Sequence, residues 1–386
     1  ETGRDVVDAE SRMGLPDDAT LAREFARARA QGAPEKWLAP FEGGFTGVVA
    51  TLNTGRPGPT LAFRVDMDAL DLSEAHDDSH RPYRDGFASC NPGMMHACAH
   101  DGHTTIGLGL AQVLKQHEAQ LNGTIKLIFQ PAEEGTRGAR AMVAAGALDD
   151  VDYFTAIHIG TGVPEGTVIC GSDNFMATTK FDVRFTGVAA HAGGKPEEGR
   201  NALLAAAQAA IALHGIAPHS EGASRVNVGV MQAGSGRNVV PADALLKVET
   251  RGESEAINHY VFERAQAVIT GAAALYGVTA GINLMGAATS SAPSPAWVDF
   301  LREQAIQVPG VTHAINKVKA PAGSEDATLM MARVQQNGGM ASYMVFGTEL
   351  SAGHHNEKFD FDEQVMNVAI ETLARTALNF PWTRGV

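Results

Sequence analysis

The sequence predicts an α/β protein whose main domain is discontinuous, because a smaller domain of different pattern is inserted into it. Three observations predict this. Apolar strands alternate with helices up to residue 175, the middle of the chain has the order β-α-β-β-α-β, and the first pattern resumes after residue 290. The 386 residues are enough for two or three domains of roughly 150 residues each.

The first part of the chain predicts a sheet covered on both faces. Strand patterns rich in apolar and β-branched residues lie at 47–52, 60–68, 124–130 and 153–160, and helical patterns lie at 104–121 and 139–148. The last three strands are almost continuously apolar, as in sheets with helices on both faces. We place this main domain, with a mixed sheet, at residues 1–175 and 291–386. Ligands of such sheets bind at the carboxyl ends of the strands.

The middle of the chain predicts an inserted domain at residues 176–290. Its strand patterns lie at 180–187, 225–234, 244–252 and 278–288, and its helical patterns lie at 199–216 and 254–277. This order is the split β-α-β-β-α-β motif of ferredoxin-like domains. The first helix is rich in alanine, but Gln208 and His214 interrupt it, which favours a buried or interface helix over a membrane segment.

The last part of the chain returns to the α/β pattern and completes the main domain. Helical patterns lie at 294–308, 323–336 and 362–378, and a strand pattern lies at 341–349. The second of these helices begins with Ser324 followed by acidic residues, so we expect Ser324 to cap its N-terminus.

Composition argues against several kinds of partner. The net charge of −14 gives the chain no field that would attract nucleic acid or an anionic membrane. No run of about 18 apolar residues predicts a membrane span, and the acidic start ETGRDVVDAE lacks the apolar core of a signal peptide. The three cysteines, Cys90, Cys98 and Cys170, are no disulfide framework, so we expect a cytoplasmic protein.

The densest group of coordinating residues is MMHACAHDGHTT, residues 94–105. Cys98 and His100 are two positions apart, so in an extended segment both side chains point the same way and can bind one ion or one pair of ions. Asp101 is well placed to orient such a ligand. The alternative is a polar loop with one buried cysteine, which needs no metal.

A second group, KLIFQPAEEGTRGA, places Glu133 and Glu134 side by side after an apolar strand. Adjacent carboxylates repel each other unless a positive charge lies beside them, and two metal ions would supply that charge. One glutamate could then bind a metal while its neighbour activates water. The alternative is a solvated turn or the acidic first turn of a helix.

Histidines and aspartates at other strand ends extend this pattern. His158 lies near the end of the strand YFTAIHIG, although a histidine at such a position is more often a core residue whose hydrogen bonds are made within the protein. The adjacent His354 and His355 follow a strand and loop in SAGHHNEKFDFDE, whose polar neighbours again suggest an ion. Asp66 and Asp68 end the strand TLAFRVDMD, where they could orient histidine ligands or simply form a turn.

The inserted domain adds three polar residues that could face a cleft. They are His191 in GVAAHAGGKPEEGRNA, Asn238 in AGSGRNVVPADA, and Arg251 at the end of ALLKVETRG. From the pattern alone, an ordinary surface position explains each of them better than a functional one.

Taken together and in this order, the motifs resemble those of the aminoacylase and carboxypeptidase-like dinuclear metallohydrolases. They are MMHACAHDGHTT, LIFQPAEEGTRGA, AAHAGGKPEEGRNAL, SGRNVVP and GHHNEKFDFDE, and the resemblance continues through LNFPWTRGV. It is strongest to the amidohydrolases that cleave indole-acetyl and benzoyl amino-acid conjugates. The resemblance implies a catalytic domain with two divalent metal ions, manganese or zinc, and an inserted lid domain used for dimerisation.

The resemblance also implies roles for individual residues. Glu133 matches the general base, and His191 matches the lid histidine that reaches the scissile carbonyl, often in the partner's site. Asn238 and Arg251 match positions that hold the substrate, with Arg251 as the candidate for a substrate carboxylate. The metal ligands that it implies are Cys98, His100, Glu134, His158 and His355. His355 is preferred to His354 because its spacing to Phe359 and the following acids fits the family pattern.

One departure from the family concerns the ligand loop, which reads Cys-Ala-His where relatives usually have Cys-Gly-His. The methyl group of Ala99 disfavours a positive φ. We therefore expect a slightly altered loop at this position.

The activity that the resemblance implies is hydrolysis of p-aminobenzoyl-glutamate, a product of folate breakdown, to p-aminobenzoate and glutamate. Two alternatives stay open. One is an N-acyl amino acid deacylase acting on benzoyl, acetyl or indole-acetyl conjugates, and the other is a metal-binding, non-catalytic partner of a B subunit. The implied assembly is a homodimer, or a heterodimer with a related B subunit.

Overall fold

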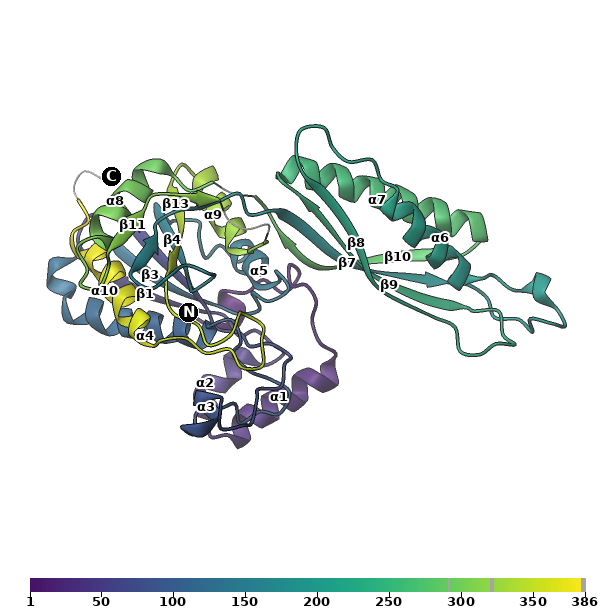
Figure 1. Ribbon diagram of the computed structural model, residues 1–386, viewed down its shortest axis with the longest axis horizontal. Coiled ribbons are helices and arrows are strands. Elements are labelled where there is room, and N and C mark those ends of the chain that lie inside the picture. Colours follow the sequence, from purple (N-terminus) through teal and green to yellow (C-terminus); the bar gives the residue numbers. More distant parts are fainter. Residues whose placement is uncertain (291, 320–322, 383–386) are drawn as a thin grey trace. The chain divides into compact units, whose positions relative to one another are not determined.

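The structure of the chain is a computed structural model that describes residues 1–290, 292–319 and 323–382 (Figure 1). It divides into two compact units. The main unit comprises Glu1–Asp173, Ser291–Pro321 and Asp326–Val386, and the second unit comprises Asn174–Ser290 and Ala322–Glu325. The main unit is therefore built from segments on both sides of the second one.

A mixed seven-stranded sheet forms the centre of the main unit, with the order β1-β3-β2-β4-β13-β5-β11. Its strands are β1 (Val48–Asn53), β2 (Thr60–Asp66), β3 (Thr124–Gln130), β4 (Tyr153–Ile159), β5 (Thr167–Ile169), β11 (His313–Ile315) and β13 (Met340–Phe346). Neighbours among β3, β2, β4 and β13 are parallel, whereas β1 and β5 run antiparallel to β3 and β13. The carboxyl ends of the four parallel strands consequently meet at one edge.

Helices cover both faces of this sheet. On one face, α4 (His100–Gln116), α8 (Pro295–Ala305) and α10 (Gln364–Leu378) share an apolar core with the strands, and α4 and α10 lie side by side (Figure 1). Helices α5 (Gly138–Ala144) and α9 (Ala327–Gln336) pack against each other and against β3, β4 and β13. Because side chains alternate along a strand, Phe63 of β2 joins the first core while Arg64 points to the opposite face.

Shorter elements complete the main unit. They are η1 (Gly3–Asp5), α1 (Asp18–Ala30), α2 (Glu35–Leu38), η2 (Ala39–Phe41), α3 (Arg81–Arg84), η3 (Glu118–Gln120), and the paired strands β6 (Ser172–Asp173) and β12 (Val318–Lys319). Helix α1 begins where the carboxylate of Asp17 accepts a hydrogen bond from the backbone N–H of Thr20.

The second unit contains an antiparallel four-stranded sheet with the order β10-β7-β9-β8. Its elements are β7 (Ala177–Thr186), η4 (Pro196–Glu198), α6 (Ala202–His214), β8 (Ser224–Ala233), β9 (Asp243–Gly252), α7 (Glu255–Tyr276) and β10 (Thr279–Ala288). Asn201 and Ser254 cap the two helices. Apart from η4, this is the β-α-β-β-α-β order read from the sequence.

Two helix starts differ from the sequence prediction. Helix α4 begins at His100 rather than Thr104, because Ala99 takes a left-handed conformation that starts the helix directly after Cys98 and Ala99. The expected cap by Ser324 is wrong: α9 begins at Ala327, and the Ser324 hydroxyl donates to the carbonyl of Met176. Within the described residues, no helix is both long and apolar enough to cross a membrane.

Candidate metal centre

The predicted ligands follow the strands that end at the carboxyl edge of the main sheet. His158 is the next-to-last residue of β4, while Glu133 and Glu134 come shortly after β3 ends at Gln130. Asp66 is the last residue of β2. Since these strands are parallel neighbours, residues separated by dozens of positions in the sequence are brought to one edge of the sheet.

The structure brings all five predicted ligands into one cluster. The ligand atoms of Cys98, His100 and His158 lie within 4.8 Å of one another. The same is true of Cys98, Glu134 and His355, and of His100, Glu133 and Glu134. These groups share members, so Glu133 stands beside the cluster as a general base would have to.

Hydrogen bonds fix the orientation of two imidazoles. Nδ1 of His100 lies 3.0 Å from the carbonyl oxygen of Asp68, and Nδ1 of His158 lies 2.8 Å from that of Ile159. A carbonyl can only accept, so each Nδ1 carries a proton, and Nε2 is the nitrogen that can bind a metal ion once it is unprotonated. Nε2 of His158 lies 3.6 Å from Sγ of Cys98, inside the cluster.

Two buried atoms of the cluster have no hydrogen-bond partner among the described residues, namely Nε2 of His100 and Oε1 of Glu134. Nε2 of His355 lies 3.1 Å from that oxygen and forms an ion pair with it when the imidazole is protonated. Buried polar atoms are rarely left unsatisfied. Cysteine thiolates, histidine imidazoles and carboxylates are common ligands of divalent metal ions, so this set of donors suits such an ion.

Carboxylates near the cluster raise the pKa of two of its histidines. Burial opposes the charged form of His100, but Asp66, Asp68 and Glu134 outweigh it and raise the pKa of His100 to about 9. Glu134 also raises the pKa of His355 above its ordinary value. The cluster therefore favours positive charge, which a proton or a metal ion can supply.

Asp68 supports the carboxylate loop directly. Its two carboxylate oxygens accept hydrogen bonds from the backbone N–H groups of Glu133 and Glu134, each at 2.9 Å. Its backbone carbonyl also accepts the hydrogen bond from Nδ1 of His100. Asp68 thus contacts one histidine and the backbone of both glutamates, whereas the sequence had suggested only contact with histidines or a turn.

Asp66 acts through a second histidine that sequence reasoning missed. Oδ1 of Asp66 lies 2.5 Å from Nδ1 of His103, and the backbone N–H of Ile159 donates to Nε2 of His103 at 2.9 Å. Burial lowers the pKa of His103 to about 3, so this imidazole is neutral. His103 therefore connects the ends of β2 and β4 beside His100 and His158.

A buried cation lies behind Asp66. Nη1 of Arg64 donates to Oδ2 of Asp66 at 2.8 Å, Nε donates to Oε1 of Gln130 at 2.7 Å, and Nη2 lies 3.5 Å from Oδ1 of Asp326. Burial alone would raise the pKa of Asp66, but Arg64 and the neighbouring imidazoles hold it well below its usual range. The network holds Asp66 charged and in place beneath the ligands.

Backbone strain is concentrated around the cluster. The non-glycine residues Ala99, Ala132, Thr136 and His355 have φ values of 67°, 52°, 61° and 63°. Such conformations cost about 1–3 kcal/mol each and occur where function or the surrounding structure imposes them. The family's glycine position is thus still left-handed here, although Ala99 carries a methyl group.

Several other candidate residues lie elsewhere. The structure does not place Asp101 against a ligand: it is exposed, and its carboxylate accepts from the N–H of Gly102. Nε2 of His354 lies 3.2 Å from the carbonyl of Ile159, and burial lowers the pKa of His354 to about 4. Of the two adjacent histidines, His355 is the one that joins the cluster.

The three candidates of the second unit do not gather at one point within it. His191 pairs with Val239 in an isolated bridge, and the N–H of Ala192 donates to the carbonyl of Asn238. These residues follow the ends of β7 and β8. Arg251 lies near the other end of β9, about 27 Å along the strand from Asp243, and it donates to Glu249 at 2.6 Å.

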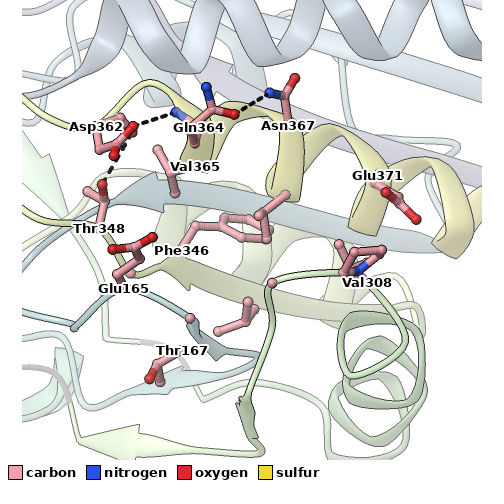
Figure 2. Close-up of a pocket in the computed structure, with 16 residues that line it drawn as sticks. Glu165, Thr167, Val308, Phe346, Thr348, Asp362, Gln364, Val365, Asn367 and Glu371 are labelled. Atoms are coloured by element: carbon pink, nitrogen blue, oxygen red, sulfur yellow. Dashed lines mark hydrogen bonds between the residues drawn. The ribbon is translucent and has the colours of Figure 1, made fainter.

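A cavity of about 350 Å³ in the main unit lies between β5, β13 and α10, and none of the predicted site residues lines it (Figure 2). Its charged lining residues are Glu165, Asp362 and Glu371. The cavity is therefore separate from the cluster, and the ligand chemistry rather than the cavity volume locates the candidate site.

Metal affinity is expected to fall as the pH is lowered from 9 to 7. The proton that the raised pKa keeps on His100 is bound below about pH 9 and must leave before a metal binds Nε2. One such proton costs up to about tenfold in apparent affinity per pH unit. Competition with a chromophoric chelator measures this; His354→Gln is the control and should keep the slope, whereas an affinity independent of pH would contradict the expectation.

Together, a carboxylate beside a cluster of Cys, His and Glu ligands at the strand ends of an α/β sheet defines a metallohydrolase. The chain belongs to the peptidase family M20/M25/M40, whose model it matches over residues 62–379.

Individual relatives resemble the chain over its whole length. It is 80% identical over 384 residues to an indole-3-acetyl-aspartic acid hydrolase of Enterobacter agglomerans, and 77% identical over 384 residues to the A subunit of the p-aminobenzoyl-glutamate hydrolase of Escherichia coli. Both alignments cover 100% of this chain and 88% of the relative.

Solved structures give the same result. An aminobenzoyl-glutamate utilization protein from Klebsiella pneumoniae is 71% identical with a TM-score of 0.88, over 100% of this chain and 88% of that one. A dinuclear metal binding peptidase of the M20 family from Bacillus subtilis is 27% identical with a TM-score of 0.65, over 95% and 93%.

Proposed function

We propose that the chain is a metal-dependent amidohydrolase that cleaves p-aminobenzoyl-glutamate to p-aminobenzoate and glutamate. The observation that carries this proposal is the cluster of Cys98, His100, Glu134, His158 and His355 with Glu133 beside it. The substrate is taken from the Escherichia coli relative that is 77% identical over 384 residues.

Each side chain has a step in this hydrolysis. Cys98, His100, Glu134, His158 and His355 would hold two divalent ions, which would supply polarisation of the amide carbonyl and a lower pKa for water. Glu133 takes a proton from the attacking water and then delivers it to the leaving amine nitrogen. His191 donates to the oxygen of the tetrahedral intermediate, where one such donor is typically worth about 3 kcal/mol. Asp68 holds Glu133 and Glu134 in place through their backbone N–H groups.

A second substrate is favoured by another relative. The indole-3-acetyl-aspartic acid hydrolase is 80% identical over 384 residues, so an indole-acetyl conjugate is the runner-up. Broader N-acyl amino acid deacylation, of benzoyl or acetyl conjugates, uses the same chemistry. A non-catalytic role beside a B subunit is disfavoured, because the ligand cluster and Glu133 are complete.

The identity of the ions is a proposal based on the ligands. Cys98 and the histidines suit zinc, while the carboxylate of Glu134 is also compatible with manganese. We propose two ions of one or the other metal per chain, held in a reducing, cytoplasmic setting that leaves Cys98 free of disulfides.

We propose that the second unit is a ferredoxin-like lid and dimerisation domain. Its strand order matches that topology, β8 is an edge strand, and Leu204 and Ile211 on α6 are 43% and 73% exposed. His191 would then act in the site of the second chain. That chain is a second copy or a related B subunit, the latter suggested by the Escherichia coli relative, whose name makes it the A subunit of its enzyme.

The test is release of p-aminobenzoate from p-aminobenzoyl-glutamate by the purified, metal-loaded chain. Indole-3-acetyl-aspartate and benzoyl and acetyl amino acids are assayed in parallel, and the highest kcat/KM assigns the substrate. Absence of hydrolysis for every conjugate, with two ions bound and the fold intact, would overturn the proposed function.

A further inference from the structure

An arginine lies in the same tight loop as the two glutamates. The loop closes where the N–H groups of Arg137 and Gly138 both donate to the carbonyl of Ala132, at 3.1 and 2.8 Å. The Arg137 side chain folds back over Gly135, the residue directly after Glu134. A Cβ at position 135 would stand 2.6 Å from Nε and 3.0 Å from Nη2 of Arg137. Glycine at 135, with φ of 85°, is what admits the guanidinium there.

This guanidinium is almost without partners. Nη1 of Arg137 donates to the carbonyl of Gly14 at a long 3.3 Å, and Nε is buried with no acceptor among the described residues. No carboxylate in the described part of the chain forms an ion pair with it. A guanidinium has five donors, so most of its hydrogen-bonding capacity is unused although it is only half-exposed.

Arg81, Lys358 and Arg64, three other cations of the main unit, each have carboxylate partners. Arg81 forms a two-pronged pair with Asp360, at 2.7 and 2.9 Å, and Lys358 lies 2.9 Å from Asp77. The buried Arg64 is surrounded by its own network. Among the described residues, Arg137 thus has no ion-pair partner, and it lies four positions after the proposed base in the same loop.

The substrates named for two relatives share one chemical feature. Indole-3-acetyl-aspartic acid and p-aminobenzoyl-glutamate have different acyl groups, but in both the amine side of the amide is an acidic amino acid. An anion must be bound against a chain with a net charge of −14. Guanidinium groups are the side chains that pair best with carboxylates, because their parallel N–H groups match the two oxygens.

We infer that Arg137 binds a carboxylate of the acidic amino acid in the substrate and so selects aspartyl and glutamyl conjugates over neutral ones. The inference rests on the proposed function and adds the residue that recognises the acidic amino acid released by hydrolysis. It differs from the expectation for Arg251, which is paired with Glu249 in the second unit. Binding would supply the acceptors that Arg137 lacks.

The test compares Arg137→Met with Arg140→Met, a matched control one helical turn later whose side chain is exposed and contacts Met13. Substrates are p-aminobenzoyl-glutamate and its two mono-amides, which lack either the side-chain or the α-carboxylate. For the glutamate conjugate, Arg137→Met should lower kcat/KM about 10- to 100-fold, mainly through KM. For the mono-amide that lacks the carboxylate read by Arg137, the loss should be less than about threefold. Arg140→Met should change neither.

Direct binding separates this inference from the proposed function. In a Glu133→Gln background, calorimetry should show the same 10- to 100-fold weakening on Arg137→Met, with partial recovery in Arg137→Lys. Equal losses for all three conjugates, or none, would overturn the inference while leaving the hydrolase intact. If the wild-type chain neither binds nor cleaves the acidic conjugates, both proposals fall together.

Discussion

The Glu133→Gln chain is expected to lose about 10²- to 10⁴-fold in kcat while keeping two metal ions per chain. The amide preserves the size and position of the side chain, and Asp68 still holds the backbone of the loop. The substitution removes the carboxylate that, in the proposed mechanism, moves a proton from water to the leaving nitrogen. Steady-state kinetics with the best conjugate and metal analysis of the same sample measure both quantities.

Glu165→Gln is the matched control for this substitution. Glu165 is an exposed carboxylate of the same unit that lines the cavity of Figure 2, away from the cluster. Its removal should leave kcat unchanged within about twofold. Near-normal turnover by Glu133→Gln would show that another group moves the proton.

The Glu133→Gln variant, combined with His191→Ala, also tests whether residues of two chains contribute to one site. If His191 acts in the partner's site, both Glu133→Gln and His191→Ala homodimers are inactive. A hybrid of the two then has one site with neither defect, so mixing them under exchange conditions should recover up to about a quarter of the wild-type rate. No recovery, despite demonstrated exchange, would place His191 in its own chain's site, and an active His191→Ala homodimer would place it outside catalysis.

The sequence was sufficient to predict which side chains cluster at the sheet edge, because the pattern around each of them is local. Continuous apolar runs predict parallel strands, and polar residues directly after such runs stand at one edge of the sheet. Glu134 and His158 were found in this way, and the structure joins them to Cys98. The family resemblance was needed to choose His355, since adjacent histidines give no local reason for preferring one.

Asp66 and Asp68 were predicted as possible orienting residues, but the buried Arg64 and its other partners were not. Arg64 sits within an apolar strand, and its partner Asp326 lies 262 positions later at the start of α9. No local pattern connects them. His103 had a signal, because it follows His100 by three positions on one helix, but its bond to Asp66 depends on how α4 packs against β2. Asp101, which was expected to orient a ligand, lies away from the cluster, whereas Asp66, Asp68 and His103 contact it.

Replacing Arg64 by Met is expected to destabilise the chain by about 3–5 kcal/mol. The Arg64 side chain is fully buried, as are those of Asp66 and Asp326. Methionine fills a similar volume but leaves two buried carboxylates without their cation and Gln130 without one of its hydrogen bonds. Urea denaturation of the metal-free chain measures the change. Arg333→Met, which breaks an exposed pair with Asp149, should cost less than about 1 kcal/mol.

A second substitution separates the charge from the packing. If the loss comes from unpaired carboxylates, Asp326→Asn in the Arg64→Met background should recover part of the stability, because it removes one buried negative charge. If the loss of stability comes instead from a cavity, adding Asp326→Asn should lower the free energy of unfolding further. Metal binding should also narrow the difference between Arg64→Met and the wild type, since divalent ions beside Asp66 would replace some of the positive charge that Arg64 supplies. If metal loading leaves the difference in unfolding free energy between Arg64→Met and the wild type unchanged, Arg64 holds the sheet and α9 together independently of the proposed metal centre.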